Sequence, residues 1–187
     1  MATKQTRTES DLIGALEIPM ECKYGVQTFR AIDNFPITGI GINRYPNIVK
    51  YLGVIKKAAA VANYETGKIS KEIYEGIVKA CDDVIAGKYN DQFPVDVIQG
   101  GAGTSTNMNA NEVIANVALE YMGHEPGQYE FCSPNDHVNG SQSTNDAYPC
   151  AVHLAMYADH LEMVKHLDML IESLEKKAEE YKNIIKM

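Results

Sequence analysis

The sequence predicts a mainly α-helical protein: a small N-terminal domain with short helices and minor β structure, followed by the first long helix of a helical bundle. Three observations carry this prediction. Glycine and proline interrupt residues 1–42 at short intervals. Amphipathic helical periodicity begins after Asn43, and from Thr144 onward almost no helix-breaking residue occurs. We therefore expect an N-terminal domain over residues 1–143 and the start of a helical-bundle domain over residues 144–187.

The first 42 residues contain no long periodic run of apolar side chains. Only short pieces, at Ile18 and at residues 24–29, fit edge strands. The first helix is expected to start at Pro46, because proline is well suited to a first helical turn. Apolar residues then recur three or four positions apart, and Gly67 is the expected end.

Two further helices are expected before residue 124. Ser70 is a suitable N-cap for the second, and Gly87 is a suitable end. Asn109 and Glu112 have the spacing of a capping-box variant, which predicts that the third helix starts at Asn109. Gly123 closes it.

The last stretch is predicted to be a single helix of roughly 40 residues, far above the mean of about 11–12. Pro149 lies in its first turns, where proline is best tolerated. Apolar residues then alternate by four and three, which forms a seam that other long helices must cover. The predicted upstream helices are too short for this, so either the protein oligomerises or the chain is a piece of something longer. The seam consists of Tyr157, Leu161, Val164, Leu167, Ile171, Leu174, Ala178, Tyr181 and Ile185.

Composition excludes several classes of protein. With 187 residues, 45% hydrophobic and 22% charged, the chain has globular rather than disordered composition. Its net charge of −8 argues against nucleic acid or an anionic membrane as a partner. No apolar run approaches the ~20 residues that span a bilayer, and the opening MATKQTRTESD lacks the apolar core of a secretory signal. Four cysteines without CxxC spacing fit a reducing cytoplasm.

Two hydroxyl-rich loops are the strongest candidates for chemistry. GGAGTSTNMN and GSQSTND each lead into a predicted helix, where free backbone N–H groups and the helix dipole attract anions. Neither has the Walker A or GxGxxG pattern of a nucleotide site. Neutral donors suit a carboxylate, and two such loops suit a small dicarboxylate if they meet in space. For any single residue, plain helix capping is the competing interpretation. The candidates are Thr104, Ser105, Thr106, Ser143, Thr144 and Asn145.

A metal site has little support in the sequence. His153 and His160 are seven residues apart on the long helix, and Glu162 and His166 are four apart. Either pair supplies two ligands, but neither has a third candidate nearby. We therefore expect solvated helix faces and no metal.

Several segments, in order, resemble the fumarase/aspartase superfamily. They are KYGVQTFRAIDNF (23–35), GGAGTSTNMNANEV (100–113), SPNDHVN (133–139) and GSQSTNDAYP (140–149). Within that superfamily the sequence most resembles the aspartate ammonia-lyase family, as does LEYMGHEPGQYEF (119–131). Fumarase-like sequences tend to read HPNDHVN and SQSSND where this chain has Ser133 and Thr144.

The resemblance implies reversible conversion of L-aspartate to fumarate and ammonia, with no organic cofactor. A base removes a proton from the carbon next to the β-carboxylate, which then carries charge as an aci-carboxylate that neutral donors stabilise. By similarity, Thr104, Ser143 and Thr144 bind the β-carboxylate and Asn145 contacts the amino group. Ser105 and Thr106 are additional candidates.

The resemblance also implies that part of the site lies elsewhere. The family's base is a serine on a mobile Gly-Ser-Ser loop, which is expected beyond Met187, as is the lysine that binds the α-carboxylate. Family members are homotetramers with a core of long helices and active sites built from three subunits. We therefore interpret the chain as an N-terminal fragment with a truncated L-aspartase-like fold, inactive alone. Two alternatives remain: a fumarase-type hydro-lyase fragment acting on malate, and a non-enzymatic helical interaction module.

Overall fold

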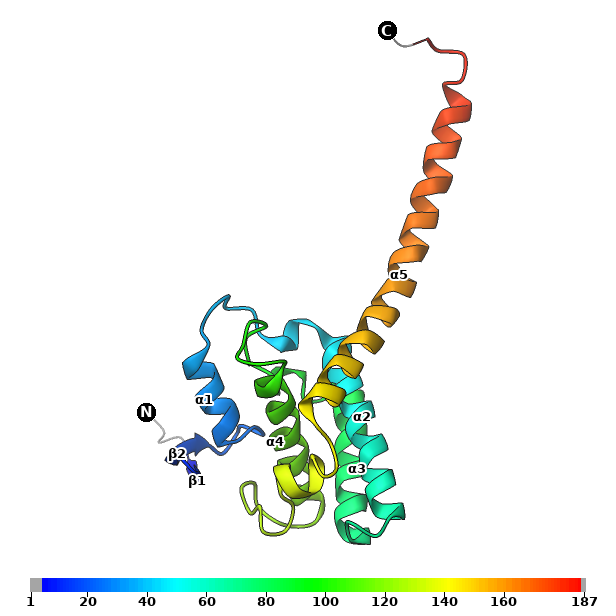
Figure 1. Cartoon of the computed structure of the whole chain (residues 1–187). Coiled ribbons are helices and arrows are strands. Elements are labelled where there is room, and N and C mark those ends of the chain that lie inside the picture. The colour runs from blue at the N-terminus through cyan, green and yellow to red at the C-terminus, as the bar shows by residue number, and fades with distance from the viewer. Residues whose placement is uncertain (1–4, 186–187) are drawn as a thin grey trace.

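A two-stranded antiparallel hairpin opens the protein in this computed structural model, which describes residues 5–185 (Figure 1). Strand β1 (Thr6–Asp11) pairs with β2 (Gly14–Pro19) in a register that joins Thr6 to Pro19 and Asp11 to Gly14. The expected strand at Ile18 is confirmed. The outermost residues of the two predicted domains, 1–4 and 186–187, lie outside the described residues.

Helix α1 (Val26–Asn34) corrects the expectation of an edge strand at residues 24–29. Its N-cap is Gly25, which has no side chain to offer. The carboxylate of Glu112, far along the chain, instead accepts hydrogen bonds from the N–H groups of Gly25, Gln27 and Thr28 at 2.8–3.0 Å. Because this acceptor comes from another helix, no local pattern announces the start of α1.

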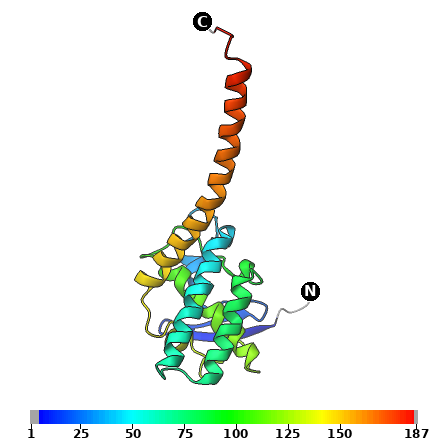
Figure 2. The ribbon, with the colours of Figure 1, turned by 90° about the vertical axis from the view of Figure 1, so that its right-hand side faces the viewer.

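The next two helices are confirmed close to their predicted bounds. Helix α2 (Pro46–Glu65) has its proline in the first turn, and α3 (Lys71–Ile85) is capped by Ser70, whose hydroxyl accepts from the N–H of Ile73. The two helices lie side by side and pack through buried apolar side chains (Figures 1 and 2). Short 3-10 turns η1 (Ile42–Arg44) and η2 (Asn90–Gln92) flank this pair in the sequence.

Helix α4 (Thr104–Tyr121) starts five residues before the predicted position. Asn109 is buried in the helix rather than at its cap, and Glu112 caps α1 instead of forming a capping box. The first turn of α4 is held by Gln99, whose side-chain oxygen accepts from the N–H of Thr106 at 2.7 Å. Gly103, with φ +90°, makes the turn into the helix. Most of α4 is buried, so it forms the centre of the helical body.

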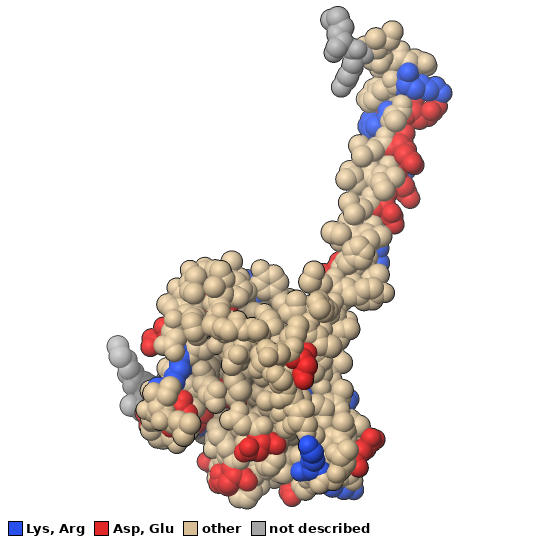
Figure 3. Space-filling view, viewed as in Figure 1, with Lys and Arg blue, Asp and Glu red and all other residues tan. Residues whose placement is uncertain are grey.

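Helix α5 (Thr144–Glu180) confirms the predicted long helix with 37 residues. A π-helical turn, η3 (Pro134–Val138), precedes it. Only the first turns of α5 are covered: Ala147, Ala151 and Ala155 are buried against the body. The rest of α5 extends away from the body (Figure 2). The seam residues over 157–178 are exposed along it, and the last two, Tyr181 and Ile185, are exposed beyond the end of the helix. Acidic side chains line one edge of this outer half (Figure 3). None of the helices over residues 5–185 is long and apolar enough to cross a membrane.

Candidate active site

The two hydroxyl-rich loops meet in space. The side-chain Nδ2 of Asn107, in the first turn of α4, donates a 3.0 Å hydrogen bond to the hydroxyl oxygen of Thr144, the first residue of α5. One turn into α5, the ring of Tyr148 packs directly on Gly103, so closely that a Cβ there would lie 2.2 Å from the ring. The spatial condition for a shared site, which the sequence left open, is therefore fulfilled.

The meeting point is formed by the N-termini of two helices. Thr104 begins α4 and Thr144 begins α5, and the start of α5 lies at one edge of the helical body (Figure 2). Thr104 shares a helix face with Asn107, three residues on, which contacts α5. Each helix N-terminus carries partial positive charge and unpaired N–H groups. Together the two helix ends favour a bound anion without help from a cationic side chain.

Ser143 is both a helix cap and a free donor. Its hydroxyl oxygen accepts from the N–H of Asn145 at 3.1 Å, and the Asp146 carboxylate completes a capping box by accepting from the Ser143 N–H at 3.3 Å. The capping interpretation is thus confirmed for this residue. A hydroxyl that accepts one bond keeps its own proton for another. Within the described part of the chain, neither the Ser143 nor the Thr144 hydroxyl donates a hydrogen bond to another residue.

Thr104 and Asn145 have polar side chains with no hydrogen-bond partner among residues 5–185. Both are exposed. Neither contributes its side chain to a cap: the residue before α4 is Gly103, and α5 is capped by Ser143. These two side chains are free to contact a ligand at the junction of α4 and α5.

Ser105 and Thr106 lie differently. The hydroxyl of Thr106 is fully buried and accepts from Nε2 of Gln99 at 2.6 Å, which commits it to holding the start of α4. Ser105 is half-buried and borders a hollow of about 190 Å³ that it shares with Asp11 and Arg30. That hollow lies toward α1 rather than toward α5.

Beneath the junction lies a lysine that sequence reasoning missed. Lys56 of α2 is fully buried, and its Nζ donates to Asn139 Oδ1 and to Gln142 Oε1, both at 3.0 Å. Burial lowers the pKa of Lys56 to about 7. One signal was available: Lys56 follows Leu52 by four residues, which places it on the apolar face of the predicted helix.

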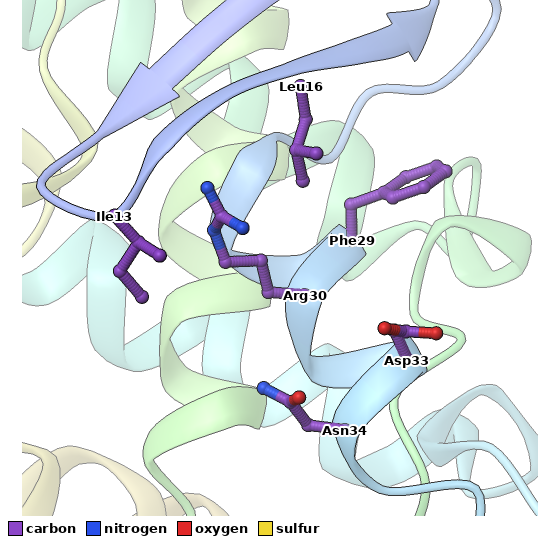
Figure 4. Close-up of a pocket in the computed structure, with 6 residues that line it drawn as sticks. All are labelled: Ile13, Leu16, Phe29, Arg30, Asp33 and Asn34. Carbon is purple, nitrogen blue, oxygen red and sulfur yellow. The ribbon is translucent and has the colours of Figure 1, made fainter.

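Hollows larger than the one beside Ser105 occur elsewhere in the molecule. One of about 420 Å³ lies between the hairpin and α1, where Phe29 and Arg30 face Ile13 and Leu16 (Figure 4). The Arg30 guanidinium is held there by Asp11 at 2.8 Å. At the candidate site, three of the predicted residues are exposed: Thr104, Ser143 and Asn145. Across residues 5–185, no three His, Cys, Asp or Glu side chains are grouped to hold a metal ion.

Comparison with known protein families places the chain in a lyase family. The sequence pattern of a family described as lyase matches residues 14–187, and the chain belongs to that family. It is 55% identical over 181 residues to aspartate ammonia-lyase from Bacillus sp, which covers 97% of this chain and 38% of that protein. Identity to aspartate ammonia-lyase from Escherichia coli K12 is 50% over 182 residues, with the same coverage. The predicted membership of the fumarase/aspartase superfamily is confirmed.

Solved structures agree. A fumarate lyase:delta crystallin structure from Brucella melitensis superposes with a TM-score of 0.93 at 49% identity, covering 98% of this chain and 43% of the other. A class II fumarase from Schistosoma mansoni reaches 0.73 at 38% identity, covering 81% and 32%. The chain therefore spans about two fifths of the length of the curated relatives it matches.

Proposed function

We propose that this chain supplies the N-terminal part of an aspartate ammonia-lyase active site, which reversibly converts L-aspartate to fumarate and ammonia. The observation that carries the proposal is the 3.0 Å contact between Asn107 and Thr144, which brings the two hydroxyl-rich loops together. The similarity to aspartate ammonia-lyases over 97% of the chain supports the choice of substrate.

The proposed roles follow from the free donors at the junction. Thr104, Ser143 and Thr144 donate hydroxyl protons to the β-carboxylate, and the Asn145 side chain contacts the amino group. When a base removes the proton from the adjacent carbon, the electron pair moves into the β-carboxylate. The C–N bond then breaks as the double bond forms, and the nitrogen leaves as ammonia. Donors fixed before the reaction stabilise that charge without reorganisation. Ser105 and Thr106 remain additional candidates.

The base and the cation for the α-carboxylate are proposed to lie outside this chain. The resemblance places a catalytic serine loop and a lysine beyond Met187, in a homotetramer whose active sites draw on three subunits. Two observations support an assembly of this kind: the exposure of Thr104, Ser143 and Asn145 at the candidate site, and the exposed seam on α5. We propose that residues 1–187 alone are inactive and that the complete enzyme is cytoplasmic.

A hybrid enzyme tests the proposal. This chain replaces the matching segment of the Bacillus sp aspartate ammonia-lyase, and release of fumarate is measured with L-aspartate and with L-malate. We expect turnover of L-aspartate and none of L-malate. Turnover of L-malate alone would identify a fumarase-type hydro-lyase. A soluble, assembled hybrid inactive on both would favour the interaction module.

A further inference from the structure

We propose that Lys56 is a positioning residue that fixes the direction of the Thr144 hydroxyl through a chain of hydrogen bonds, Lys56–Asn139–Asn107–Thr144. The inference rests on the proposed function, because the hydroxyl matters if Thr144 binds substrate. It assigns a task to a residue that no loop motif contains.

The first link is the buried amino group. Lys56 is 0% exposed, and none of the ion pairs within residues 5–185 includes it. Its Nζ instead donates to two amide oxygens, of Asn139 and Gln142, at 3.0 Å each. An ammonium group has only donors, and a neutral amine still has two. As the ammonium, Lys56 can therefore face only the oxygen of Asn139. The neutral amine also has a lone pair, but it can use its two donors for Asn139 Oδ1 and Gln142 Oε1, the two contacts that the structure shows.

The second link passes through Asn107. Asn139 Oδ1 also accepts from Asn107 Nδ2 at 3.1 Å. Since Asn139 must present oxygen there, Asn107 must present its NH₂ group. The second proton of that group goes to Thr144 Oγ1 at 3.0 Å. Asn107 is 1% exposed, and its own oxygen has no partner among the described residues, so nothing else in that region holds this amide in place.

The last link sets the role of the hydroxyl. Because Thr144 Oγ1 accepts from Asn107, its proton points away from α4 and is available to a ligand. A reversed Asn107 amide would place an oxygen beside Thr144, and the hydroxyl would then donate inward. The carboxylate of a substrate would lose a donor although every side chain stayed in place. Lys56 therefore decides whether Thr144 is a donor toward the site.

A double-mutant cycle in the hybrid enzyme tests this link. Lys56→Met keeps the length of the side chain and removes the donor. We expect it to lower kcat/KM roughly ten- to hundredfold, a part of the loss caused by removing a whole oxyanion donor. In a Thr144→Val background, Lys56→Met should lower kcat/KM by less than about threefold, because the hydroxyl that Lys56 orients is gone. Equal losses in both backgrounds would mean a purely structural role and would overturn the inference.

A second variant covers the case in which Lys56→Met fails to fold. Asn107→Leu breaks the hydrogen-bond chain at its middle and keeps the volume of the side chain. The amide oxygen that it removes has no partner in the described region, so its loss breaks no hydrogen bond. Like Lys56→Met, Asn107→Leu should lower kcat/KM strongly when Thr144 is present and only slightly in the Thr144→Val background. Lys57→Met is the control: the neighbouring lysine pairs with Asp82 at the surface and should leave kcat/KM within about twofold.

Side-chain NMR of the 187-residue chain separates this inference from the proposed function, since it needs no activity. The Asn107 side-chain amide protons should exchange slowly with solvent, and Lys56→Met should accelerate their exchange at least about tenfold while Lys57→Met does not. Unchanged exchange in folded Lys56→Met would overturn the inference even in an active hybrid. Accelerated exchange with an inactive hybrid would uphold the hydrogen-bond chain and reject the function.

Discussion

Glu112 in the middle of α4 accepts two hydrogen bonds from Thr28 in the first turn of α1, one from its N–H at 3.0 Å and one from its hydroxyl at 2.6 Å. The carboxylate also accepts from the N–H groups of Gly25 and Gln27. It is buried, and burial raises its pKa even though these donors oppose the rise. A carboxylate from the central helix thus takes the place of an N-cap side chain and ties the N-terminal segment to the core.

Glu112→Gln should destabilise the chain by about 2–3 kcal/mol, because the new amide nitrogen would face a backbone N–H group and leave it buried without an acceptor. Denaturant unfolding of the 187-residue chain measures the loss. The matched control is Glu72→Gln, an exposed glutamate in the first turn of α3, which should cost less than about 0.5 kcal/mol. Equal losses in the two variants would refute the capping role of Glu112.

Gly103→Ala should separate the two loops. Gly103 has φ +90°, and an added Cβ would lie 2.2 Å from the Tyr148 ring. Gly67→Ala is a suitable comparison, since Gly67 has φ +74° and nothing within 4 Å of the added carbon. It should cost only the left-handed strain of about 1–2 kcal/mol. We expect Gly103→Ala to cost at least about 1 kcal/mol more. Similar melting temperatures for the two variants would speak against close packing of α5 on the loop.

The buried lysine predicts a pH dependence of stability. The pKa of Lys56 is lowered to about 7 in the folded chain by burial, against an ordinary value of 10.5. Between these values the unfolded state binds the extra proton, so the free energy of unfolding should rise with pH, by up to about 1.4 kcal/mol per unit. Lys56→Met should remove this slope between pH 7 and 8.5, whereas Lys57→Met should keep it. The same slope in wild type and Lys56→Met would contradict a depressed pKa.

The exposed seam predicts self-association of the 187-residue chain. Leu161 and Leu174 are 48% and 60% exposed on α5 and lie on the predicted seam. Replacing both by Gln should raise the dissociation constant at least about tenfold, because each buried leucine contributes roughly 1.5–3 kcal/mol. Glu172→Gln, also exposed on α5, should have little effect. Sedimentation equilibrium measures both, and a monomeric wild-type chain would exclude association through the seam in this chain alone.

Helices with local signals were predictable from the sequence. Pro46 and Ser70 mark the starts of α2 and α3, and the unbroken run after Thr144 marks α5. The starts of α1 and α4 were missed, because their first N–H groups are satisfied by Glu112 and by the side chain of Gln99 rather than by a residue of the standard cap pattern.

The candidate residues could be named from the sequence, but the hydrogen bonds that hold them together could not. Runs of hydroxyls before two helices identified Thr104 and Thr144 as candidates. Their convergence depends on Asn107, and the polarity of that contact depends on Lys56, which is 83 residues away from its partner Asn139. A hydrogen-bond chain between distant segments leaves no periodic trace in a sequence.

The most direct test of the proposed site is kcat/KM for L-aspartate in the hybrid enzyme carrying Thr144→Val, with Thr66→Val as control. Thr66 is exposed at the end of α2, where its hydroxyl donates to the carbonyl of Ala62. Loss of the Thr144 hydroxyl should lower kcat/KM by about 10²–10³, the effect of removing one oxyanion donor, while the control stays within about twofold. A folded Thr144→Val hybrid as active as the control would contradict a substrate site at the junction of α4 and α5.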